Sequence, residues 1–232
     1  MIVRSAWVQW WFCVGLWMSI LGISPANGAS TDAKTFDGAA LLSDPGFERW
    51  FSGAIRIQQG DRVLFEVYRG ADASGEPFDE SSLFWLASNS KVLTAAVMVQ
   101  LADEGLVTLT DPIGMHLPGW NPEDLRKAGQ DCTIQRLLSH QCGIPSDLAP
   151  PSYATWLDPV RRPDIQAPFL AHMRTVEQAF TPGEDYRYSN LGYTLAGLII
   201  LQHEAGTFDE ILQRRLFRPM GLQRTGFEPA RV

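Results

Sequence analysis

Residues 83–105, LFWLASNSKVLTAAVMVQLADEG, decide the fold because they place Ser88 and Lys91 at the start of a long apolar run. Between residues 92 and 99 only Thr94 is polar, which predicts a helix buried in the middle of a domain. We expect Ser88 in the first turn of this helix, where unpaired backbone N–H groups and the helix dipole favour negative charge. Lys91 lies three residues further on and therefore shares the face of Ser88.

The pairing of Ser88 with Lys91 predicts an activated nucleophile. Apolar surroundings remove water from a lysine and lower its pKa, so that the amine can act as a base or hold a neighbouring group deprotonated. The alternative for an isolated S-x-x-K is that Ser88 caps the helix while Lys91 extends along it to solvent. For an isolated S-x-x-K the second interpretation is the more common one.

A second pair of polar residues lies in the stretch YRYSNLGY, which contains Tyr188 and Asn190. Residues two apart in an extended segment point to the same side. The pair therefore offers a phenol that can move a proton beside an amide that can hold a carbonyl group. The alternative is that Asn190 caps the helix that we expect from Leu191.

Several motifs then follow one another in a characteristic order. After S-x-x-K come LLSHQCGIPSD at 137–147, FTPGEDYRYSNLGYTLAGLII at 180–200 and LFRPMGLQRTGF at 216–227. From about residue 41 to its end the chain resembles the serine β-lactamase and penicillin-binding protein superfamily. The resemblance is greatest to the class C β-lactamase-like branch, which also contains D-alanyl-D-alanine carboxypeptidases and esterases.

The resemblance implies an α+β fold of the β-lactamase/transpeptidase type, with a helical region packed on an antiparallel sheet. It implies that Ser88 is the acylated nucleophile, Lys91 its activating partner, Tyr188 the general base and acid, and Asn190 a ligand of the substrate carbonyl. The substrate would be a small-molecule or peptidoglycan-like amide, ester or lactam, and neither a cofactor nor a metal is expected. His140 lies in a family-like segment, and we expect it to hold the loop after its helix.

One motif of the family is absent from the sequence. A Lys or His followed by Ser/Thr-Gly, on a strand beyond Y-x-N, has no match after Tyr188. We therefore expect a chain that lacks C-terminal strands and turns over poorly. The rival hypothesis is a non-catalytic or truncated remnant that acts as a binding module or as half of a split enzyme.

The secondary structure can be predicted from turn and cap residues. Gly60-Asp61 lies between two alternating segments and indicates a hairpin over 53–69. Six prolines between 143 and 168 predict a long irregular loop, either a lid bearing Tyr153 and Trp156 or a surface excursion. Helices are expected over 41–53, 133–139, from 191 to Gly206, and from 207 to Gly221.

Cys132 and Cys142 flank one of these predicted helices. Ten helical residues would hold them about 15 Å apart, which is too far for a disulfide. We therefore expect two free thiols. No Cys/His spacing in the sequence resembles a metal site.

Residues 1–28 predict a leader that is separate from the hydrolase-like domain at 29–232. An uncharged apolar run ends in SPANGAS, where Ala26 and Gly28 suit positions −3 and −1 of a cleavage site. Export to the periplasm or medium is expected, with an uncleaved membrane anchor as the alternative. A net charge of −7 argues against nucleic acid as a partner.

Overall fold

The computed structural model describes residues 2–4, 38–119, 132–146, 160, 162–173 and 176–226. The chain divides into two compact units, one of Val3–Phe84 and one of Trp85–Val232 with Met1–Ile2. Strands and helices follow one another along the chain, which confirms the α+β class. Apart from the short strand β1 (Ile2–Arg4), the predicted leader lies outside the described residues.

The unit of Val3–Phe84 begins with two short helices, α2 (Gly38–Leu42) and α3 (Pro45–Trp50). The single helix predicted over 41–53 is wrong, because Asp44 and Pro45 interrupt it. Asp44 has an extended backbone and caps α3 by accepting a hydrogen bond from the Phe47 N–H at 2.9 Å. Pro45 fixes its own φ at the first helical position and disfavours helical geometry in the residue before it.

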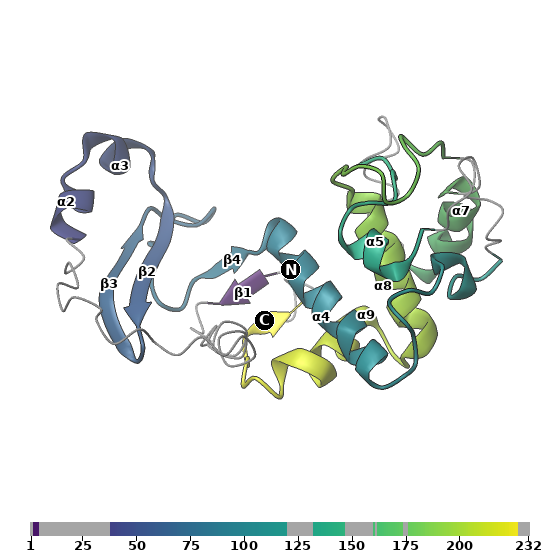
Figure 1. Ribbon diagram of the computed structural model, residues 1–232. Coiled ribbons are helices and arrows are strands. Elements are labelled where there is room, and N and C mark those ends of the chain that lie inside the picture. The colour runs from purple at the N-terminus through teal and green to yellow at the C-terminus, as the bar shows by residue number, and fades with distance from the viewer. Residues whose placement is uncertain are drawn as a thin grey trace, which may run out of the picture. The chain divides into compact units, whose positions relative to one another are not determined.

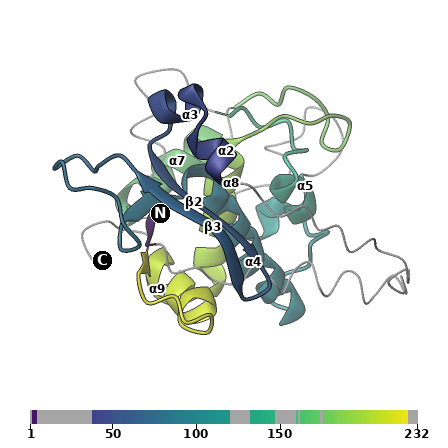
Figure 2. The same ribbon diagram turned by 90° about the vertical axis from the view of Figure 1, so that its left-hand side faces the viewer.

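The predicted hairpin is confirmed by strands β2 (Gly53–Gln59) and β3 (Arg62–Arg69). The two strands pair antiparallel from Gly53 opposite Arg69, with a register shift between Ile57 and Gln58. Gly60 adopts a φ of +58° in the connecting turn, a conformation that glycine reaches without strain. Helices α2 and α3 lie at the end of the hairpin opposite this turn (Figures 1 and 2).

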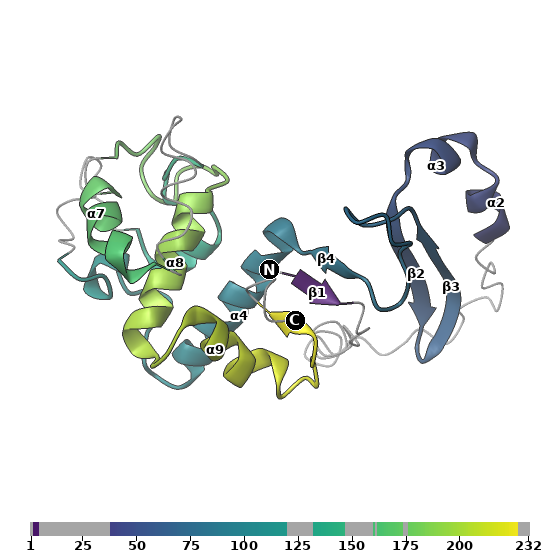
Figure 3. The same cartoon turned by 180° about the vertical axis from the view of Figure 1, so that it is seen from behind.

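Helix α8 (Asn190–His203) forms the centre of the unit that begins at Trp85. In Figures 1 and 3 it runs between α4 (Ser90–Asp103) on one side and α7 (Pro163–Met173) on the other, and α5 (Ile134–Leu138) packs against it. Its apolar residues are nearly all buried, and α4 buries one face against the same core. The fully buried side chains of these two helices include Val97, Met98, Leu101, Leu195, Ile199 and Ile200.

Helices α4 and α8 run in the same direction. Lys91 in the first turn of α4 bonds Asn190 at the start of α8, and the far ends of both helices meet at one arginine. Arg215 makes a bidentate ion pair with Glu104, the C-cap of α4, at 2.6 and 2.8 Å, and also binds Glu204, the C-cap of α8. A cation is favourable at both helix C-termini, so this contact holds the two helices side by side.

The remaining elements differ in part from expectation. The predicted loop over 143–168 is wrong at its end, because α7 begins at Pro163, where a proline is tolerated, and contains Pro168. The part of that loop with Tyr153 and Trp156 lies outside the described residues. The amphipathic segment after Gly206 forms α9 (Phe208–Leu212), with a capping box at Thr207, and continues as the π-helix η4 (Gln213–Phe217). Short elements complete the described chain: β4 (Leu83–Trp85), η1 (Ala87–Asn89), η2 (Ile113–Met115) and β5 (Thr225–Gly226).

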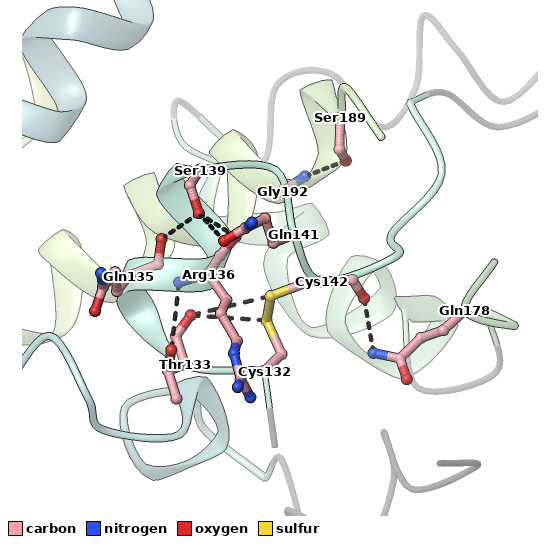
Figure 4. Close-up of a disulfide and its surroundings, with 10 residues drawn as sticks. All are labelled: Cys132, Thr133, Gln135, Arg136, Ser139, Gln141, Cys142, Gln178, Ser189 and Gly192. Carbon is pink, nitrogen blue, oxygen red and sulfur yellow. Dashed lines mark hydrogen bonds between the residues drawn. A yellow bond between two sulfur atoms is a disulfide. The ribbon is translucent and has the colours of Figure 1, made fainter. Parts of the chain in front are cut away.

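The expectation of free thiols at Cys132 and Cys142 is wrong, because the two residues form a disulfide with their Cα atoms 5.2 Å apart (Figure 4). The intervening segment is not ten residues of helix. Helix α5 ends after five residues, and the chain then reverses at His140, whose φ is +61°. The reversal brings Cys142 back beside the start of α5, so the distance along a helix axis does not apply.

Across the described part of the chain, no helix is long and apolar enough to span a membrane.

Candidate active site

Ser88 lies in η1, a 3₁₀ turn that leads directly into α4. The expectation that it occupies the first α-helical turn is therefore wrong by two residues, since α4 begins at Ser90. Ala87, immediately before it, has a φ of +45°, a left-handed conformation that costs a non-glycine residue about 1–2 kcal/mol. Strain of this kind persists only where the surrounding structure enforces it, and here it lies directly before Ser88.

Lys91 links the two polar pairs predicted from the sequence. Its Nζ donates a hydrogen bond to Asn190 Oδ1 at 2.8 Å and a longer one to Ser88 Oγ at 3.4 Å. The same ammonium lies 4.7 Å from the centre of the Tyr188 ring and 5.6 Å from that of Tyr193. Lys91 therefore does not extend to solvent along the helix, because aromatic rings and an amide oxygen surround its charge.

Tyr188 completes the group around the serine. Its hydroxyl donates a hydrogen bond to Ser88 Oγ at 2.7 Å, although the two residues are 100 positions apart in the sequence. The fold thus brings Ser88, Lys91, Tyr188 and Asn190 into one connected set of contacts. Ser88 Oγ is thus within reach of both a phenol and an ammonium.

Ser189, and not Asn190, caps helix α8. Its hydroxyl accepts a hydrogen bond from the Gly192 N–H and donates one to the Pro145 carbonyl, both at 2.8 Å. The alternative role of Asn190 as a cap is therefore wrong. As the first residue of α8, Asn190 is left to bond Lys91 through its side-chain oxygen.

His140 packs behind the tyrosines. Its ring centre lies 4.6 Å from that of Tyr188 and 5.2 Å from that of Tyr193, and its Nδ1 accepts a hydrogen bond from the Ser189 N–H at 3.1 Å. Burial, and to a lesser extent the charge of Lys91, lowers the pKa of His140 below its ordinary value. A neutral imidazole can serve as the acceptor that this contact requires.

Tyr193 is a member of the site that sequence reasoning missed. Its hydroxyl donates a hydrogen bond to the Leu138 carbonyl at 2.9 Å, and its ring faces Lys91. Burial raises the pKa of Tyr193, and the neighbouring Tyr188 and Tyr186 add to the effect. The sequence could have indicated this, because Tyr193 is three residues after Asn190 in a predicted helix and residues at that spacing share a face.

The arrangement can activate a hydroxyl and stabilise the negative charge that develops on it. Both α4 and α8 begin at this cluster, so the positive ends of two helix dipoles lie beside Ser88 Oγ. No group of three or more His, Cys, Asp or Glu side chains within the described residues could hold a metal ion.

Comparison with known proteins gives a consistent result. Residues 40–232 match the family described as Beta-lactamase. Penicillin-binding protein 4 of Amycolatopsis lactamdurans is 33% identical over 180 residues, which cover 77% of this chain and 45% of that protein. A second curated relative, from Bacillus subtilis, is covered over 40% of its length, so the chain spans less than half of these relatives.

Solved structures of similar fold carry related descriptions. A penicillin-binding protein from Bacillus halodurans aligns with a TM-score of 0.62 at 26% identity, over 78% of this chain and 54% of that one. A beta-lactamase/D-alanine carboxypeptidase from Yersinia pestis aligns with a TM-score of 0.50 at 26% identity, over 61% of this chain and 40% of that one.

Proposed function

The chain belongs to the Beta-lactamase family, and we propose that it is an exported serine hydrolase that forms an acyl-enzyme on Ser88. One observation carries the proposal: Ser88 Oγ lies 2.7 Å from the Tyr188 hydroxyl and 3.4 Å from Lys91 Nζ. A nucleophile within hydrogen-bond reach of a proton acceptor, which a third group orients, is the arrangement that covalent catalysis requires.

In the proposed acylation, Ser88 Oγ attacks the carbonyl carbon of an amide, ester or lactam. Its proton passes to the oxygen of Tyr188, which acts as the base in its phenolate form. Collapse of the tetrahedral intermediate breaks the bond to the leaving group, and Tyr188 returns the proton to the leaving nitrogen or oxygen. A water molecule then attacks the acyl carbon while Tyr188 accepts its proton; the bond to Ser88 Oγ breaks, Tyr188 returns the proton to Ser88 Oγ, and the carboxylic acid product leaves.

Lys91 contributes charge to both partners in this exchange. Its ammonium lies over the Tyr188 ring and near Ser88 Oγ, so it favours the phenolate and the developing oxyanion alike. Asn190 fixes the ammonium through its Oδ1 acceptor, and we propose from the family resemblance that its side-chain amide also contacts the substrate carbonyl.

The substrate class is proposed from the relatives. The similar proteins are described as penicillin-binding proteins and as a beta-lactamase/D-alanine carboxypeptidase. We infer a small-molecule or peptidoglycan-like acyl substrate for this chain. The apolar leader at 1–28 supports an extracytoplasmic location, and the intact mass of exported protein tests whether cleavage occurs near Gly28.

Labelling with a fluorescent penicillin, and separately with a phosphonate ester, tests the catalytic assignment. Mass spectrometry of a digest should locate the adduct on Ser88, and Ser88→Ala should abolish it. Ser90→Ala is the matched control, because it removes a hydroxyl from the same segment without touching the proposed site. Lys91→Ala and Tyr188→Phe should each slow labelling by about 10²–10⁴.

Labelling that persists in Ser88→Ala would refute the assignment of the nucleophile. Reversible binding of penicillin without any covalent adduct, in chain that is folded by circular dichroism, would favour the binding-module alternative instead.

A further inference from the structure

His140 binds the chain on both sides of Tyr188. Its carbonyl accepts a hydrogen bond from the Arg187 N–H at 2.9 Å, and its Nδ1 accepts one from the Ser189 N–H at 3.1 Å. Its ring also lies against the ring of Tyr188, with centres 4.6 Å apart. Because the backbone is held at the residue before and the residue after Tyr188, and the ring is packed as well, the hydroxyl has little freedom to move.

The segment that presents His140 is itself fixed. The Gln141 N–H donates to the Arg136 carbonyl at 2.8 Å, which closes the end of α5. The Cys132–Cys142 disulfide ties the same segment to the start of that helix, and the Cys142 carbonyl accepts a bond from the Gln178 side chain at 2.9 Å (Figure 4). His140 is thus a fixed acceptor, and the Tyr188 segment rests on it.

The contact between His140 Nδ1 and the Ser189 N–H depends on protonation. Nδ1 accepts a hydrogen bond only when the ring is neutral and its proton is on Nε2. Among the residues that the structure describes, the groups that face this ring are Lys91 from α4, Tyr193 from α8, and Tyr186 and Tyr188 from the segment before α8. None of these is a carboxylate, so the surroundings favour the neutral ring that can act as acceptor.

We propose that His140 is a positioning residue for Tyr188, acting as a neutral hydrogen-bond acceptor that keeps the tyrosine hydroxyl on Ser88 Oγ. The proposal rests on the function proposed above. It predicts that protonation of His140 replaces the acceptor with a donor facing the Ser189 N–H, which releases the segment and withdraws Tyr188 from the serine.

Two variants of the full chain separate this role from packing. His140→Asn keeps an acceptor at the δ position and tolerates positive φ, whereas His140→Phe keeps the ring and loses the acceptor. With a chromogenic ester as substrate, His140→Phe should lower kcat by about 10–100-fold and leave KM within about threefold. His140→Asn should restore most of the lost kcat.

The pH profile provides the readout that a purely structural role would not move. The parent chain should lose kcat as the pH falls and His140 becomes protonated, whereas His140→Asn should lack this loss because its amide does not titrate. Equal losses of kcat in the two variants at neutral pH, an unchanged kcat in His140→Phe, or the same acid limb in His140→Asn would each overturn the proposal.

A second readout does not depend on catalysis. Nitrogen NMR of the imidazole should find the proton of His140 on Nε2, and exchange of the Ser189 amide should be slow in the parent and in His140→Asn but faster in His140→Phe. A proton on Nδ1 would overturn the proposal. Absence of labelling at Ser88 in the parent, with these NMR results intact, would refute the proposed function and leave the placement of Tyr188 by His140 standing.

Discussion

Removal of the Cys132–Cys142 disulfide should lower the free energy of unfolding of the unit that begins at Trp85, by an amount that follows from the length of the loop it closes. The bridge closes a loop between residues ten apart in the sequence. Loop closure of that length lowers the entropy of the unfolded chain by an amount equivalent to about 2.7 kcal/mol at 25 °C. Both cysteines are buried, with only 2% of their surface exposed, so Cys132→Ala with Cys142→Ala should cost this much or slightly more.

Urea unfolding followed by far-UV circular dichroism measures the loss, because most of the described helical residues belong to the unit that begins at Trp85. With a slope of about 2 kcal/mol per molar urea, the midpoint should fall by about 1.3 M. Adding a reductant to the parent should reproduce most of the shift. The double variant is the control for reductant, since it has no bridge left to reduce.

Thiol counting on the unfolded, non-reduced full chain provides the independent check. One reactive thiol is expected, that of Cys13, because the other two of the three cysteines are bridged. Three thiols would refute the disulfide, and one thiol with no change in the urea midpoint of the double variant would refute the argument from loop closure.

Three further substitutions test the packing and charges of the same unit. Gly143→Ala should destabilise it by at least about 2 kcal/mol in urea unfolding, because a Cβ would lie 2.6 Å from the Phe180 carbonyl oxygen at a φ of +67°. Thr207→Ala should cost about 1 kcal/mol by removing a capping box, measured in the same way. His203 hydrogen-bonds His116, and burial lowers the pKa of His203 in the folded chain. As the pH drops below about 6.5, the ordinary pKa of histidine, the unfolded chain binds a proton at His203 before the folded chain does, so stability should fall. Urea midpoints measured across pH should show a smaller fall in His203→Gln.

Local sequence patterns predict those parts of the fold whose geometry is decided by neighbouring residues. Gly60 and Asp61 terminate two alternating segments, and the hairpin follows from them. The same reasoning fails where one residue changes the direction of the chain. A helix over 133–139 is correctly expected, but nothing in its sequence indicates that His140 adopts positive φ and brings Cys142 back to Cys132.

The sequence indicated four of the residues that meet at the candidate site, but not Tyr193 and not the geometry. Ser88 with Lys91, and Tyr188 with Asn190, each lie within one short segment, and the resemblance assigns both pairs to one site. The meeting of the two segments depends on α4 and α8 running side by side, which is fixed by buried apolar contacts and by Arg215 at their far ends.

The contacts that position the tyrosine come from a third segment. His140 approaches Tyr188 only because α5 ends after five residues and the disulfide closes the turn behind it. A pattern search identifies groups that can react, whereas the groups that hold them make backbone contacts that carry no residue signature. The Ser189 N–H can bond to many types of acceptor, so no particular residue type is required opposite it. The sequence therefore does not indicate that His140 is its partner, and the folded structure does.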